Sequence, residues 1–94
     1  MKPYSLYTYL CKNHVGKQNA VKSNSLELLF NCKGTDIREA VNIMRSQGKP
    51  ICSDVHGYYI AASMSDLSRT INQLQGRVSK ITSAIEGLKT RTTV

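Results

Sequence analysis

Over the last third of the chain, apolar residues recur at alternating steps of three and four, the spacing of a heptad seam on one long helix. Ser63 provides an N-cap, with Asp66 three residues later, and the helix is predicted to run to about Lys89. The seam spans about 36 Å at 1.5 Å per residue, more than the core of so short a chain can cover. We expect its first turns, residues 64–71, to pack partly on the rest of the chain and the seam as a whole to pair with another copy. Its members are Met64, Leu67, Ile71, Leu74, Val78, Ile81, Ile85 and Leu88.

The identities of the seam residues favour a particular kind of pairing. With Met64 at heptad position a, three of the four a positions are β-branched and three of the four d positions are leucine, which favours two parallel helices. Ile81 at a d position departs from this pattern, and the flanking e and g positions form no opposite-charge pairs. An antiparallel dimer and a tetramer therefore stay open.

The first half of the chain predicts shorter elements. Residues 4–11 place Leu6, Tyr7 and Leu10 on one face of a helix that ends between residues 14 and 16. A polar connection follows, in which residues 20–22 suit a short edge strand. Ser23 or Ser25 is expected to cap a second helix over residues 26–30.

A third helix is predicted over residues 36–47, capped by Thr35 and stopped by Gly48. Ile37, Ala40, Val41 and Met44 follow the i, i+3, i+4, i+7 pattern of one buried face. Residues 50–53 and 57–61 are β-prone runs, and residues 54–57 between them have turn chemistry, which predicts a hairpin.

The order of these elements predicts the fold class. It is mainly α with a small β-hairpin: a winged helix-turn-helix followed by a long C-terminal coiled-coil helix. The expected boundaries are a winged-helix DNA-binding domain over residues 1–62, an oligomerisation helix over residues 63–90 and a tail over residues 91–94.

The outward face of the third helix carries the candidate DNA-binding residues. Arg38, Asn42 and Arg45 lie four and three residues apart, on one stripe. Arginine can fork to guanine, asparagine can bridge adenine, and either can hold a phosphate. Thr35 at the helix start, and Lys33 and Lys49 at its two ends, are expected to meet backbone phosphates. The alternative is an ordinary solvated face on which Arg38 pairs with a neighbouring acid.

Charge and composition narrow the function classes. The chain carries 13 Lys and Arg against 6 Asp and Glu, a net charge of +7, which favours nucleic acid first and an acidic protein or membrane surface second. No window has transmembrane length, and neither a secretory segment nor an enzyme motif is recognised, so we expect no membrane association and a reducing intracellular compartment. Cys11, Cys32 and Cys52 are interpreted as small buried hydrophobes. Their spacing relative to His14 and His56 matches no standard zinc arrangement, and we expect no metal or other cofactor.

Several motifs over residues 34–78 resemble a family of small winged-helix proteins from bacteriophages and prophages of Gram-positive bacteria. The resemblance is carried by an arginine-bearing helix, then Gly48-Lys49-Pro50-Ile51-Cys52-Ser53, then Gly57-Tyr58-Tyr59-Ile60-Ala61, then a capped helix with Leu74 and Arg77. It implies a role in phage DNA replication or transcription control, in the cytoplasm of a bacterial host, with Arg38, Asn42 and Arg45 on the DNA-facing helix.

Two functional hypotheses follow. The first is a sequence-specific double-stranded DNA-binding protein that acts as a homodimer or higher oligomer. The second is a protein-interaction module that binds and inhibits a host protein. The tip of the hairpin keeps this hypothesis open, because Asp54, Val55 and His56 include an acid and no Lys or Arg. His56 can contact a phosphate if it is protonated, but we interpret it as an ordinary turn histidine.

Overall fold

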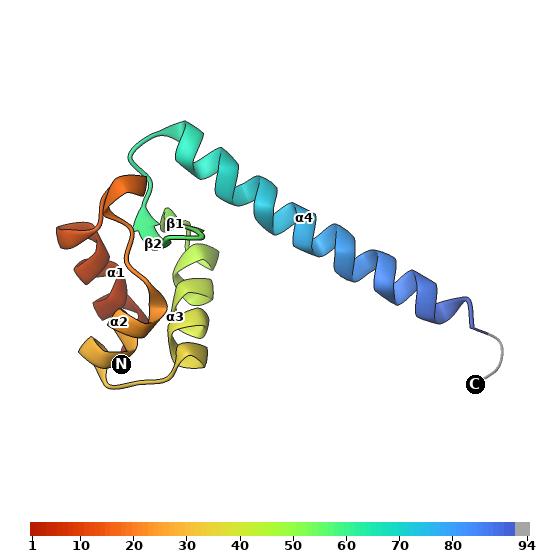
Figure 1. Cartoon of the computed structure of the whole chain (residues 1–94), viewed down its shortest axis with the longest axis horizontal. Helices are drawn as coiled ribbons and strands as arrows, with labels where there is room; N and C mark the ends of the chain where they lie inside the picture. The colour runs from red at the N-terminus through yellow and green to blue at the C-terminus, as the bar shows by residue number, and fades with distance from the viewer. Residues whose placement is uncertain (92–94) are drawn as a thin grey trace.

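Three helices and a hairpin form a body from which one long helix projects, as Figure 1 shows for the computed structural model, in which residues 1–91 are described. The fold is mainly helical with a small two-stranded antiparallel sheet, as the sequence predicts. The elements in chain order are α1 (Pro3–Asn13), the 3₁₀ turn η1 (Lys17–Asn19), α2 (Ser23–Phe30), α3 (Gly34–Ser46), β1 (Ile51–Asp54), β2 (Gly57–Ile60) and α4 (Met64–Lys89).

One apolar core joins the elements of the body. The four residues predicted for the inner face of α3 are all buried. α1 contributes two leucines, α2 one, and the hairpin two isoleucines, so every element of the body supplies at least one side chain. The core residues are Leu6, Leu10, Leu26, Ile37, Ala40, Val41, Met44, Ile51 and Ile60.

The predicted starts of α2 and α3 are wrong by a few residues. α2 begins at Ser23 with Lys22 as its N-cap, so neither Ser23 nor Ser25 is the capping residue. α3 begins at Gly34 with Lys33 as its N-cap, and Thr35 lies within its first turn. The Asp36 carboxylate accepts a hydrogen bond from the Lys33 main-chain N–H at 2.9 Å. The predicted N-cap, Thr35, is therefore wrong, and the Asp36 carboxylate in the first turn holds the start of the helix.

The hairpin has the predicted turn and gains a partial third strand. Gly57 has the positive φ that the turn needs, +122°. Val21 and Tyr58 exchange two main-chain hydrogen bonds of 2.9 and 2.7 Å, so the edge strand expected over residues 20–22 is present as a single antiparallel bridge. This bridge ties the segment before α2 to the hairpin, and therefore brings the start of α2 next to β2.

α4 joins the body through a polar junction. The Ser63 hydroxyl accepts from the Asp66 N–H, which confirms the predicted N-cap. Asp66 and Thr70 are buried, and the Thr70 hydroxyl accepts a hydrogen bond from the Ser53 N–H at 3.4 Å. The Asp66 carboxylate accepts from the Ala62 N–H at 2.9 Å and pairs with Arg69.

The first turns of α4, residues 64–71, pack partly on the body, as expected, but the seam residues make little of this contact. Met64 is 74 % exposed and Ile71 is 45 % exposed, and of the seam residues in these turns only Leu67 is half-buried. The body contacts the neighbouring face of the helix, that of Asp66 and Thr70. Beyond this junction α4 extends away from the body (Figure 1).

The cysteine prediction is confirmed for one residue of three. Cys52 is buried, whereas Cys11 and Cys32 are half-buried, and all three are free thiols. The predicted division at residues 62 and 63 coincides with the turn between the hairpin and α4. The predicted tail, residues 91–94, lies outside the described residues except for Arg91.

Candidate nucleic-acid interface

The outward stripe of α3 is the starting point of the site. Because Ile37 and Val41 turn into the core, Arg38 and Asn42 project from the opposite side of the helix, and both are exposed. They lie one turn apart and both line a cleft of about 440 Å³. Thr35, one turn before Arg38, is also exposed. The structure therefore brings Arg38 and Asn42 together and leaves both side chains accessible.

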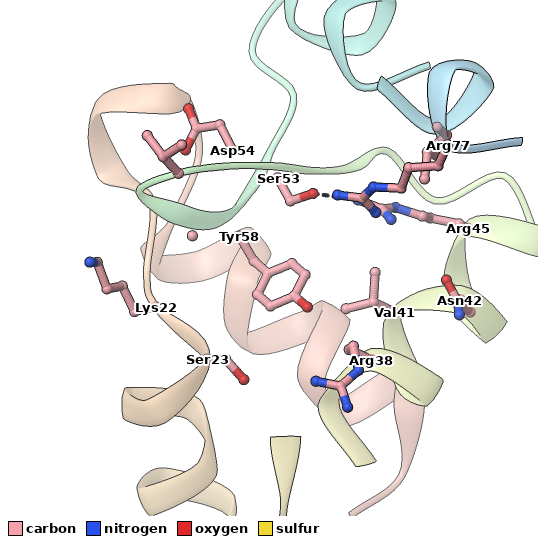
Figure 2. A pocket seen from close by; sticks show the side chains of 13 residues that line it. Lys22, Ser23, Arg38, Val41, Asn42, Arg45, Ser53, Asp54, Tyr58 and Arg77 are labelled. Atoms are coloured by element: carbon pink, nitrogen blue, oxygen red, sulfur yellow. Dashed lines mark hydrogen bonds between the residues drawn. The ribbon is translucent and has the colours of Figure 1, made fainter. Parts of the chain in front are cut away.

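Arg45, the third residue of the predicted stripe, is committed to the hairpin. Its Nε atom donates to the Ile51 carbonyl oxygen at 2.8 Å, and its Nη2 atom donates to the Ser53 hydroxyl at 3.2 Å (Figure 2). Burial lowers the pKa of this guanidinium group, and the nearby positive charge of Arg77 lowers it further. Arg45 remains on the wall of the cleft, but two of its donors orient β1 instead of being free for a base edge.

The two lysines expected at the ends of α3 are not in the cleft. Lys33 is exposed, and it lines a separate hollow together with Asp36 and Glu39. The Lys49 ammonium group lies 5.4 Å from the centre of the Tyr7 ring, a cation–π contact with α1. Contacts of these lysines with a nucleic acid would be peripheral to the cleft.

The hairpin forms the opposite wall of the cleft. Tyr58 is half-buried and its ring lies near the middle of the cleft, between the hairpin and α3 (Figure 2). At the tip, the Asp54 carboxylate accepts from the His56 N–H at 2.7 Å, so it stabilises the turn. Val55 is 85 % exposed. The tip thus presents an apolar side chain next to a carboxylate.

The structure adds two cations that were not among the predicted site residues. Lys22 lines the cleft because the Val21–Tyr58 bridge holds its segment against the hairpin. Arg77 lines it from α4. Arg77 lies seven residues after Thr70, which packs on β1, so both belong to the same heptad position and the same side of α4. The seven-residue spacing could have predicted Arg77 as a site residue, but only if the contact of Thr70 with the hairpin were already known.

Most of the heptad seam of α4 is exposed in the described chain, although Leu74 lines the cleft. Leu67 and Leu74 are half-buried, and the other six seam residues are 45 to 74 % exposed. Thr70 lies about 100° from Ile71 around the helix but only about 40–60° from Leu67 and Leu74, so the seam and the body-facing side of α4 overlap at these two leucines. From Val78 to Leu88 the seam residues are 46 to 74 % exposed, and this part of the seam is accessible to a second helix.

Residues 1–91 contain neither a metal-binding cluster nor a helix suited to cross a membrane. Within this range, no three His, Cys, Asp or Glu side chains are grouped so that they could hold a metal ion. None of the helices there combines the length and the apolar character that a bilayer-spanning segment requires. The chain matches no family model, no curated protein and no solved structure.

Proposed function

We propose that this chain is a winged helix-turn-helix protein that binds double-stranded DNA as a homodimer. In this proposal α2 and α3 form the helix-turn-helix, α3 enters the major groove, and the β1–β2 hairpin is the wing. A role in transcription regulation or DNA replication is the one that the resemblance to small phage proteins implies. The observation that carries the proposal is the accessibility of Arg38 and Asn42 on the outward stripe of α3, next to a cleft lined by further cations.

The chemistry of the exposed stripe suits base recognition. Arg38 forms no ion pair in the described chain, and the Asn42 side chain is exposed, so the donors of both are available to a ligand. Arginine presents two parallel N–H groups to guanine O6 and N7, and asparagine both donates to and accepts from adenine. The net charge of +7 adds a general attraction to the phosphate backbone.

The exposed seam of α4 supports self-association. Six of its eight apolar residues remain at least 45 % exposed, although burying each one contributes about 1.5–3 kcal/mol. Because the seam continues beyond the turns of α4 that contact the body, two seams can pair over residues 78–88 with both DNA-binding faces still accessible. Two copies would then read two half-sites, and the preferred sequence would be an inverted repeat.

The test is selection of bound duplexes from a random pool, followed by binding measurements on the selected sequence. Arg38→Ala and Asn42→Ala are each expected to weaken binding by about 1–3 kcal/mol and to relax preference at one position of each half-site. Lys12→Ala is the matched control, because Lys12 is exposed on α1 and does not line the cleft. Selection that enriches no sequence, together with unchanged affinity of both variants, would contradict sequence-specific binding through α3.

The second candidate is capture of a host protein. The observation that favours it is exposed apolar surface away from α4: Leu28 on α2 and Val55 at the hairpin tip are each 85 % exposed. Single exposed apolar residues are common on monomeric proteins, so this observation is weaker than the arrangement on α3. A partner that binds the pure protein, loses affinity in Val55→Ser and competes with duplex DNA would favour this candidate.

A further inference from the structure

The cleft beside α3 gathers positive charge from three regions of the chain. Lys22 comes from the segment before α2, Arg38 and Arg45 come from α3, and Arg77 comes from α4. Asn42 and Ser53 add uncharged polar groups to the same walls. These residues are brought together only by the fold, and Figure 2 shows their side chains around one opening.

The arginines of this cleft are not neutralised by the protein. Within residues 1–90 the ion pairs are Arg69–Asp66 and Lys89–Glu86, and neither involves the cleft. Arg45 and Arg77 are close enough that the charge of Arg77 disfavours the charged form of Arg45. Two guanidinium groups held near each other with no carboxylate between them repel, and an anion bound by both would relieve that repulsion.

Two acids lie near the cleft. Asp54 is on its wall, on the same side as Lys22 in Figure 2, and it also lines a neighbouring hollow together with Arg77. Glu27 and Arg38 both flank Gly34, and the Glu27 carboxylate accepts a hydrogen bond from the Ser23 hydroxyl at 3.0 Å. Neither acid forms a salt bridge with Arg45 or Arg77, so these two arginines of the cleft remain available to an anion.

We propose that Arg77 of α4 and Arg45 of α3 together hold one phosphate group of the DNA backbone. This inference rests on the proposed function and assigns a DNA contact to the helix that carries the oligomerisation seam. Arg45 uses Nε and Nη2 to hold the hairpin, which leaves Nη1 for the phosphate. Arg77 is exposed, and none of its five N–H groups is engaged in the hydrogen bonds described above. Asn42 lies beside them and can donate a further hydrogen bond.

The division of roles has a physical consequence. Arg38 and Asn42, one turn apart on α3, face the base edges, whereas the Arg45–Arg77 pair fixes the backbone relative to α3 and carries no sequence information. Because Arg77 is on α4, the phosphate also links the DNA to the helix that joins the two copies. Binding of DNA would therefore restrain the angle between α4 and the body.

The test compares Arg77→Ala, Arg77→Lys and Lys89→Ala in binding to the selected duplex over a range of salt concentrations. Lys89 is the matched control, because it is an exposed cation of the same helix outside the cleft. We expect Arg77→Ala to weaken binding about tenfold, equally for specific and non-specific duplexes, and to reduce the slope of log K against log salt by about 0.9 per copy. Arg77→Lys is expected to restore part of the affinity, because lysine supplies the charge without the fork.

Three outcomes separate this inference from the proposed function. If Arg77→Ala binds DNA with the affinity and the salt slope of the wild-type protein, the phosphate contact is overturned and the proposed function stands. A wild-type chain that binds no duplex DNA would overturn both. In that case inorganic phosphate can be added and the NMR signals of the Asn42 side-chain amide followed. A shift in wild type and not in Arg77→Ala would show that the site binds free phosphate, which contradicts the DNA backbone as the source of the anion.

Discussion

Arg45 donates from its Nε atom to the main-chain oxygen of Ile51 over 2.8 Å, and this bond joins the end of α3 to the first residue of the hairpin. A second bond from Nη2 to the Ser53 hydroxyl makes the contact a fork. Arg45→Ala should therefore lower the free energy of unfolding by about 1–3 kcal/mol, because the Ile51 carbonyl loses a charged donor. Urea unfolding followed by circular dichroism measures this change.

Two variants provide the controls for Arg45. Arg45→Lys should not restore stability fully, because an ammonium group cannot reproduce the fork. Arg38→Ala removes an exposed arginine of the same helix and should change stability by less than about 0.5 kcal/mol. Equal effects of Arg45→Ala and Arg38→Ala would show that the bonds to β1 contribute nothing to folding.

Substitutions at Gly57 and Gly48 test how much the close contact between the hairpin and Val21 contributes to stability. Both have positive φ, +122° and +82°, but a Cβ atom on Gly57 would lie 2.1 Å from the Val21 carbonyl oxygen, whereas nothing lies within 4 Å of one on Gly48. Gly48→Ala should cost about 1 kcal/mol from backbone strain alone. Gly57→Ala should cost clearly more, since the Val21–Tyr58 bridge must open. Similar losses in the two variants would contradict this account of the third strand.

The stability of the protein should decline at alkaline pH. Burial raises the pKa of the Cys52 thiol and of the Tyr59 phenol. Both groups are neutral when protonated, so their contribution is complete below their unfolded pKa values, about 8.5 and 10, and is lost as the pH rises through the higher folded values. Urea midpoints should therefore fall between pH 7.5 and 9.5, and fall less in Cys52→Ala. An identical decline in both proteins would exclude the thiol as a cause.

The seam of α4 is tested by placing charge on it. Val78 and Ile85 are 62 % and 46 % exposed in the single chain, and in a dimer they would be buried. The double variant Val78→Glu/Ile85→Glu should raise the dissociation constant of the dimer at least about 100-fold, because each apolar contact contributes about 1.5–3 kcal/mol. Ser79→Glu, on an exposed position outside the seam, should leave it unchanged. Light scattering that reports a monomer for wild type at high concentration would refute the dimer.

The sequence was sufficient to predict those elements in which the local pattern of apolar residues agrees with their burial in the fold. The period of Ile37, Ala40, Val41 and Met44 gave the inner face of α3, and Ser63 with Asp66 gave the start of α4. Helix starts were less predictable because several residues compete for the same free amides. Lys33, and not Thr35, is the N-cap of α3, and its amide is satisfied by the Asp36 carboxylate.

The site was only partly predictable, because its geometry depends on contacts between distant segments. Arg45 has the spacing of a groove-facing residue, yet the nearby carbonyl of Ile51 engages its guanidinium group. Arg77 reaches the cleft only because Thr70 anchors α4 to Ser53. The contacts of Arg45 with Ile51 and of Thr70 with Ser53 have no periodic signature in the sequence, whereas the exposed pair Arg38 and Asn42 does.

The salt dependence of binding to duplex DNA tests the central claim most directly. Titration of a labelled duplex with the full chain between 50 and 300 mM salt yields log K against log salt, and each phosphate contact contributes about −0.9 to the slope. We predict tight binding at low salt and a slope of about −3 or steeper for each copy, as expected if the cations around the cleft engage several phosphates. No complex with duplex DNA at 50 mM salt, or an affinity that does not change with salt, would contradict the account.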